Sequence, residues 1–192
     1  MTSPIEFLQA PIEHLAALLR RLGTRFHLSG DIARLAWGEP RSIHEVEVVL
    51  DGDELRPHLE AFLQGLRGAG FVFQDRMVAE AVDDSEMFAL LDPVHCLKLN
   101  IHTHSQVLGE FQRSVTVEVF AGQMLPVASR VDVMVLNLVR AGKGCRESRH
   151  ELGRLLDQMT ANEFEILWEQ ARMNRLTDLL EEVLEESDPI SM

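Results

Sequence analysis

Two acidic residues, Glu45 and Glu47, are separated by one residue at the start of a β-branched, apolar segment that ends at Leu50. Successive side chains of a strand point to opposite faces, so both carboxylates point to one side while Val46 and Val48 point into a core. Paired carboxylates suit Mg²⁺-assisted phosphoryl or nucleotidyl transfer, because hard divalent cations take oxygen ligands and neutralise the leaving phosphate. Alternating acids are also typical of a solvent-exposed strand face, and the spacing alone leaves both interpretations open.

The residues before this segment predict elements that would position it. Phe26 to Leu28 is expected to form a short strand that enters a turn at Ser29-Gly30-Asp31. Ile32 to Trp37 is expected to form a short helix that ends at Gly38 and Pro40. The predicted order is strand, glycine turn, short helix, Pro-Arg pair and a strand that carries two acids.

This order resembles the signature of the minimal nucleotidyltransferase fold of the DNA polymerase β-like superfamily. That superfamily includes abortive-infection toxins and small nucleotidyltransferases that act as antitoxins to HEPN-domain toxins. The family pattern is a strand, Gly-Gly or Gly-Ser, a helix, often Gly-x-Pro-Arg-x-Thr, and Asp-x-Asp on a strand. The matching residues are Ser29-Gly30-Asp31, Gly38 to Ile43 and Glu45-Val46-Glu47, and the resemblance extends over roughly Leu15 to Met159.

The resemblance also implies roles for individual residues. Lys98-Leu99-Asn100 is similar to the later strand that bears the family's third acid, and Ser129 to Leu156 is similar to its helical region after the last hairpin. Glu45 and Glu47 would then be catalytic and would hold Mg²⁺ or Mn²⁺ together with Asn100. The expected nucleotide contacts are Ser29, Gly30, Arg41 and Lys98, although Arg41 and Lys98 could equally form surface ion pairs.

Three departures from the family pattern fall at this one site. Asp31 brings a carboxylate to the turn where a triphosphate would approach backbone N–H groups, which should oppose phosphate binding. Both aspartates are glutamates, longer by one C–C bond of about 1.5 Å, and Mg²⁺ tolerates little misplacement of its ligands. The third acid is Asn100. The pattern therefore favours an atypical or decayed site over an efficient transferase.

Two functional hypotheses follow. The first is a nucleotidyltransferase that moves a nucleoside monophosphate from a triphosphate to a protein, an RNA or a small-molecule acceptor. The alternative is a catalytically inactive domain of the same fold that binds a protein partner, for example in a toxin–antitoxin-like pair. The partner or a second copy would contact the C-terminal helices, where Leu176, Leu179, Leu180, Val183 and Leu184 form an apolar stripe. Most such stripes pack on their own domain.

A second polar cluster consists of His95, Cys96, His102 and His104. On an extended strand, His102 and His104 would share a face with Lys98 and Asn100, and imidazoles two residues apart can bind Zn²⁺ or another transition metal. Two histidines do not complete a four-ligand site, and a polar strand end near solvent explains them equally well.

Composition limits the class of protein. The chain has 192 residues, 46% hydrophobic and 26% charged, which excludes disordered and collagen-like chains. Its net charge of -13 argues against binding duplex DNA. Two cysteines without a Cys-x-x-Cys pair indicate a reducing, cytoplasmic location. No apolar run is long enough for a membrane span, and the N-terminus has no signal-peptide pattern.

We therefore predict an α/β (α+β) fold: a mixed sheet of about five to six strands flanked by helices, in residues 1–128, with a helical C-terminal section over residues 129–192. Further strands are expected at Phe71–Phe73, Met87–Leu91, Cys96–Ile101, Ser114–Phe120 and Gln123–Val127. Helices are expected at Ile12–Leu22, Leu55–Leu66, Val131–Arg140, Arg146–Met159, Asn162–Met173 and Arg175–Glu186. Thr160 and Glu163 have the spacing of a capping box.

Overall fold

The structure, a computed structural model, describes residues 6–38, 43, 45–156 and 159–187. The chain divides into two compact units, Met1–Ala128 and Ser129–Met192. Among the described residues, no helix combines the length and the apolar character needed to cross a bilayer.

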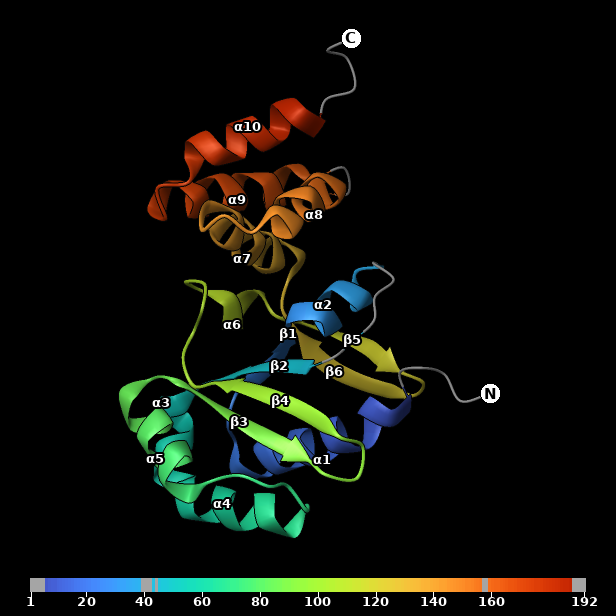
Figure 1. The fold of residues 1–192 in the computed structure, drawn as a ribbon, viewed down its shortest axis with the longest axis vertical. Coiled ribbons are helices and arrows are strands. Elements are labelled where there is room, and N and C mark those ends of the chain that lie inside the picture. The colour runs from blue at the N-terminus through green and yellow to red at the C-terminus, as the bar shows by residue number, and fades with distance from the viewer. Residues whose placement is uncertain (1–5, 39–42, 44, 157–158, 188–192) are drawn as a thin grey trace. The chain divides into compact units, whose positions relative to one another are not determined.

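The first unit contains a six-stranded sheet and its flanking helices (Figure 1). Its strands are β1 (Phe26–Ser29), β2 (Glu45–Leu50), β3 (Met87–Asp92), β4 (Leu97–His102), β5 (Val115–Phe120) and β6 (Gln123–Val127). Its helices are α1 (Glu6–Leu22), α2 (Gly30–Ala36), α3 (Gly52–Leu55), the 3-10 turn η1 (Arg56–His58), α4 (Leu59–Gly68), α5 (Asp75–Asp84) and α6 (Glu110–Arg113). The predicted α+β class with a mixed sheet of five to six strands is confirmed.

The strand order is β3-β4-β2-β1-β6-β5. β2 lies between β1, to which it runs antiparallel, and β4, to which it runs parallel. A parallel neighbour requires a crossover connection, and α3, η1, α4, α5 and β3 supply it. This arrangement brings the two acids of β2 between residues that lie far from them in sequence.

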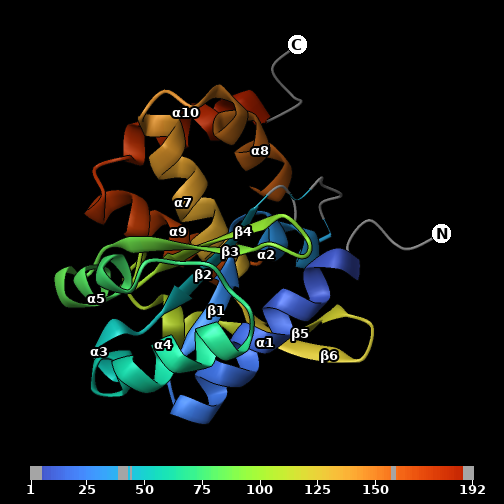
Figure 2. The ribbon, with the colours of Figure 1, turned by 60° about the horizontal axis from the view of Figure 1, so that its bottom comes forward.

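One face of the sheet forms the core of the unit. Val46, Val48 and Leu50 of β2 are buried on that face, and Figure 2 shows α1 and α4 on its side of the strands. Phe62 of α4 contacts Phe88 of β3 edge-on, with 6.3 Å between ring centroids. Since this face is filled by apolar side chains, Glu45 and Glu47 lie on the opposite face, as their alternation predicts.

Two expected elements of the first unit were wrong. Phe71–Phe73 does not form a strand of the sheet; Val72 makes a single bridge to Leu91. The helix expected at Leu55–Leu66 is three pieces, α3, η1 and α4, with Pro57 inside η1. Proline removes a backbone donor and crowds the preceding turn, so the chain tightens there and continues as a helix afterwards.

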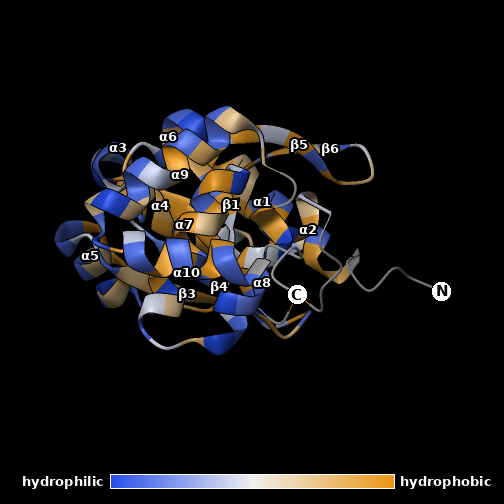
Figure 3. Ribbon diagram, turned by 90° about the horizontal axis from the view of Figure 1, so that it is seen from above, coloured by the Kyte–Doolittle hydropathy of each residue, from blue (hydrophilic) through white to orange (hydrophobic). Residues whose placement is uncertain are grey.

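The second unit contains four described helices, α7 (Arg130–Gly142), α8 (Arg146–Leu156), α9 (Ala161–Met173) and α10 (Thr177–Ser187). The predicted capping box is present at the start of α9, where Thr160 and Glu163 bond each other's backbone N–H groups. Figure 3 shows hydrophilic and hydrophobic residues mixed around α10. Leu180 and Val183 of its apolar stripe are buried, and α10 contacts α8, α9 and α7. The stripe thus packs inside its own unit.

Arg149 of α8 holds α10 through two carboxylates. Its guanidinium donates to Glu182 at 3.0 Å and to Glu186 at 2.8 Å. The hydrogen bond from Arg149 to Glu186 keeps the pKa of Glu186 below its usual value. An acid with a depressed folded-state pKa stabilises the fold when ionised, and its contribution disappears as pH falls through that folded value. Arg149→Met should therefore lower the Tm slightly at pH 7, and this difference should shrink in acid below the usual carboxyl range. Thermal melts from pH 7 to pH 3 measure it.

Arg154→Met is the matched control, because Arg154 is another arginine of α8, exposed to solvent, and its guanidinium contacts His150 rather than a carboxylate. A Tm difference for Arg149→Met that stayed constant down to pH 3 would show that the carboxylates do not carry the effect.

Candidate functional site

Glu47 lies at the centre of a row of polar residues that crosses three strands. In the register of the sheet, Ser29 of β1 lies opposite Glu47 on one side, and Asn100 of β4 lies opposite it on the other. Glu45, two residues earlier, lies opposite Lys98 in the same way. Residues paired across neighbouring strands share a face. The five side chains therefore gather on the face of the sheet that the core does not use.

Glu45 is held by both of its neighbours on β4. Asn100 Nδ2 donates to Glu45 Oε2 at 2.8 Å, and Lys98 Nζ lies 3.5 Å from the same oxygen. The side chains of Glu45 and Lys98 are about half exposed, at 45% and 52%, so solvent screens their ion pair. Glu45 therefore has a cation and a neutral donor beside it.

Glu47 lies directly against the turn that ends β1. Gly30 has a φ of +58°, in the left-handed region, and a Cβ built on it would lie 2.9 Å from both Cδ and Oε2 of Glu47. Glycine tolerates this φ at little cost, and its missing side chain leaves room for the carboxylate. The turn backbone and the Glu47 carboxylate are thus packed in contact.

Two buried oxygen atoms flank Glu47 without hydrogen-bond partners among the described residues. They are the Oγ atom of Ser29 and the Oδ1 atom of Asn100. A carboxylate accepts only N–H or O–H donors, so the Asn100 amide must turn its nitrogen toward Glu45, which leaves Oδ1 unpaired. A buried polar atom without a partner costs on the order of 1–3 kcal/mol. Unpaired oxygens on either side of a carboxylate fit a ligand that brings a cation or donors.

A divalent cation is compatible with this donor set. Glu47 supplies a carboxylate and Asn100 supplies a buried, unpaired amide oxygen, and both are ligands that Mg²⁺ and Mn²⁺ accept. The described residues contain no group of three or more His, Cys, Asp and Glu side chains placed to hold a metal. The amide oxygen of Asn100 would therefore be needed to complete the protein's share of the ligands.

The negative charge of Asp31 is balanced within its own helix. Arg34, a buried residue one turn later, places Nη1 3.5 Å from Asp31 Oδ1. Asp31 was expected to oppose phosphate because Arg34 was left out of account, although the i,i+3 spacing in a predicted helix was a signal for the pair. Trp37 at the end of α2 donates from Nε1 to the Ala128 carbonyl at 3.0 Å, which ties the helix to the chain after β6.

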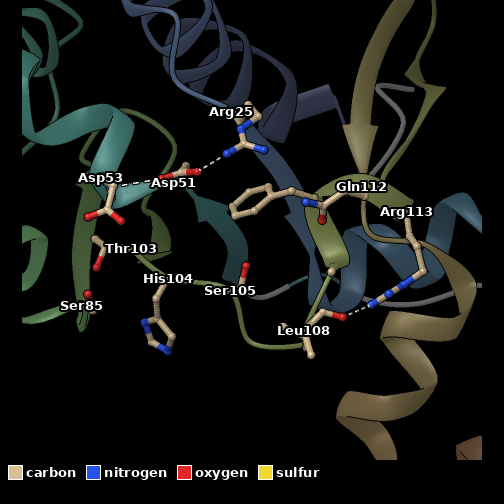
Figure 4. Close-up of a pocket in the computed structure, with 13 residues that line it drawn as sticks. Arg25, Asp51, Asp53, Ser85, Thr103, His104, Ser105, Leu108, Gln112 and Arg113 are labelled. Carbon is tan, nitrogen blue, oxygen red and sulfur yellow. Dashed lines mark hydrogen bonds and ion pairs between the residues drawn. The ribbon is translucent and has the colours of Figure 1, made fainter. Parts of the chain in front are cut away.

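The other candidate residues that the sequence indicated are Arg41, His102 and His104. Arg41 lies outside the described residues. His102 contacts Gln106, with 2.8 Å between His102 Nδ1 and Gln106 Nε2, and His104 follows the end of β4. His104 lines a separate cavity of about 510 Å³ with Arg25, Asp51, Ser105 and Gln112 (Figure 4). The two histidines thus do not converge on one metal position.

The cavity lies at the other end of the strands from the acids. Arg25 immediately precedes β1 and Asp51 immediately follows β2, whereas Ser29 ends β1 and Glu45 begins β2. A fully buried contact between His27 of β1 and Glu110 of α6 was not predicted from the sequence. His27 Nε2 lies 3.7 Å from Glu110 Oε2. Glu110 is in a four-residue helix that the sequence pattern does not signal.

The mixed six-stranded sheet with its flanking helices, followed by C-terminal helices, corresponds to a nucleotidyltransferase-like fold. Among solved structures, the chain is similar to the antibiotic-resistance factor ANT(2'')-Ia, an aminoglycoside nucleotidyltransferase. The TM-score is 0.57 at 15% sequence identity, over 93% of this chain and 98% of that one. No protein-family model matches the chain, and no curated protein matches it.

Proposed function

We propose that the protein binds a nucleoside triphosphate at Ser29, Glu47 and Asn100 of this row and at the adjoining Gly30, and transfers its nucleoside monophosphate to an acceptor. The observation that carries the proposal is the pair of unpaired, buried oxygens on either side of Glu47. A fold does not by itself imply an activity. These atoms belong to the site itself, and their burial without a hydrogen bond costs free energy unless a ligand bonds to them.

Each of these residues has a role in the proposed reaction. The Ser29 hydroxyl donates to a phosphate oxygen, and Gly30 lets the triphosphate approach the turn backbone. Glu47 and Asn100, with Glu45 beside them, hold Mg²⁺ or Mn²⁺, which when bound stabilises charge on the phosphates. The acceptor's nucleophile forms a bond to the α-phosphorus, the bond from that phosphorus to the bridging oxygen breaks, and pyrophosphate leaves with the bond's electrons.

A small molecule is the acceptor class that we propose to test first. ANT(2'')-Ia is an aminoglycoside nucleotidyltransferase, so a small molecule with hydroxyl groups is the first class to test, before a protein or an RNA. Both cysteines are free, which supports a reducing, cytoplasmic setting.

A second candidate is a nucleotide-binding or partner-binding domain without transferase activity. The Lys98–Glu45 contact favours it, since a cation already lies beside one of the two acids. A protein partner, as in a toxin–antitoxin-like pair, would have to use surfaces other than the buried part of the α10 stripe. This candidate would be supported if the protein bound a triphosphate but transferred its nucleotide to no small molecule, protein or RNA.

Ser29→Ala tests the proposal most directly. Removing a buried hydroxyl that has no partner should leave the free protein as stable as before, or more stable by up to about 1 kcal/mol. The same change should weaken triphosphate binding about tenfold or more, because a hydrogen bond to a charged group is lost. Calorimetry with the four nucleoside triphosphates and Mn²⁺ measures the binding, and thermal melts measure the stability.

Ser114→Ala is a suitable control. Ser114 Oγ donates to the Phe111 carbonyl at 2.9 Å, so its loss should lower stability without changing triphosphate binding. If Ser29→Ala instead destabilised the protein and left binding unchanged, Ser29 would be a structural residue and the proposal would lose its main support. No heat with any triphosphate, with or without metal, would refute it.

A further inference from the structure

Lys98 is an unusual residue in this chain because lysine is rare in it. The sequence has 18 basic residues, of which only Lys98 and Lys143 are lysines. Arginine presents a planar fork, whereas lysine presents a compact point charge on a flexible stem. One of the two compact cations of the chain thus lies beside an acid of the candidate site.

The Lys98 contact divides the two acids into unequal positions. On one side, Glu45 Oε2 already receives the Asn100 amide at 2.8 Å and has the Lys98 ammonium at 3.5 Å. On the other side, Glu47 is flanked by the unpaired oxygens of Ser29 and Asn100. An incoming cation would compete with Lys98 for Glu45. Beside Glu47, by contrast, Ser29 Oγ and Asn100 Oδ1 have no hydrogen-bond partner among the described residues.

The charges of the row also favour a single cation. Two glutamates and one lysine give the row a net charge of minus one, since Asn100 is neutral. Binding of one divalent cation changes the net charge of the row to plus one, and binding of a second would change it to plus three. Two-metal phosphoryl-transfer sites hold both ions with shared anionic ligands, and this row lacks the third carboxylate that would balance a second ion.

We infer that Lys98 takes the place of one divalent cation, so that the site binds a single Mg²⁺ or Mn²⁺ on the Glu47–Asn100 side while Lys98 supplies the second positive charge at Glu45. The inference rests on the proposed function, because it concerns the same site. Lys98 is then a residue that sets metal number and affinity, and it weakens metal binding by competing for Glu45.

The test is a titration of the full-length protein with Mn²⁺ alone, with free Mn²⁺ measured by electron paramagnetic resonance. The native protein should bind one ion per chain. Lys98→Met removes the charge and keeps an unbranched side chain, so its Mn²⁺ affinity should rise about tenfold, as expected for a half-exposed unit charge near a ligand. Lys143→Met, at the exposed end of α7, is the matched control and should leave the affinity unchanged. The double variant Lys98→Met/Asn100→Asp should bind two ions.

The outcomes separate this inference from the proposed function. Two ions per native chain, or an unchanged affinity in Lys98→Met, would overturn the role of Lys98 while leaving nucleotide transfer standing. An equal gain in Lys143→Met would attribute the effect to overall charge and would also overturn it. If no variant bound Mn²⁺, even with a non-hydrolysable triphosphate present, both the inference and the proposed function would fail.

Discussion

Glu47→Gln should abolish metal-dependent triphosphate binding, with a loss of at least about a hundredfold in affinity or transfer rate. Glutamine keeps the shape of the side chain but removes the charge that attracts a divalent cation. Glu47 is central because it alone lies between Ser29 and Asn100 in the sheet register. Calorimetry with Mn²⁺ and each triphosphate measures the affinity, and circular dichroism checks the fold.

This variant should still fold, because glutamine has the size and shape of glutamate. Glu45 and Glu47 are two residues apart on one strand face, about 6.6 Å along the strand, and removing one charge relieves their repulsion. Glu60→Gln is the matched control, because Glu60 is an exposed acid on α4, and it should leave binding unchanged. Retained metal-dependent binding in Glu47→Gln would mean that the row around Glu47 is not the binding site.

Gly30→Ala should impair binding far more than it impairs folding. The left-handed φ of +58° costs an alanine about 1–2 kcal/mol. The new Cβ would also lie 2.9 Å from Cδ and Oε2 of Glu47. Because those atoms end a flexible side chain, the carboxylate moves aside rather than the backbone. We expect triphosphate affinity to fall tenfold or more, as measured by calorimetry, since a shift of about 1 Å in a site can cost a hundredfold in rate.

Gly38→Ala is the control that distinguishes backbone strain at a positive φ from displacement of the Glu47 carboxylate. Gly38 has a φ of +90°, but a Cβ there would meet no atom within 4 Å among the described residues. Both variants should therefore lose comparable stability in thermal melts, and only Gly30→Ala should lose affinity. Equal losses of affinity in the two variants would show that the position of the Glu47 carboxylate is not what Gly30 protects.

Much of the local structure of the sheet and of the C-terminal helices could be predicted, because their periodicity is strong. The acids and valines of β2 alternate as a half-buried strand must, and the Thr160–Glu163 spacing predicted the start of α9. α5 was missed because only Val78, Ala81 and Val82 form its buried side, within a segment that is otherwise mostly polar and charged. Phe71–Phe73 was mistaken for a strand because two phenylalanines and a valine have high β-propensity whether or not a partner strand is present.

The sequence by itself determined the residue types of the site and the strand face on which Glu45 and Glu47 lie. Local alternation sets that face without help from the rest of the chain. Only the tertiary structure decided which residues flank those acids. Ser29, Glu47 and Asn100 come from three strands, and their register depends on the packing of the whole apolar face, where a slip of one residue would turn each side chain to the other side. The contact of Lys98 with Glu45 follows from that register.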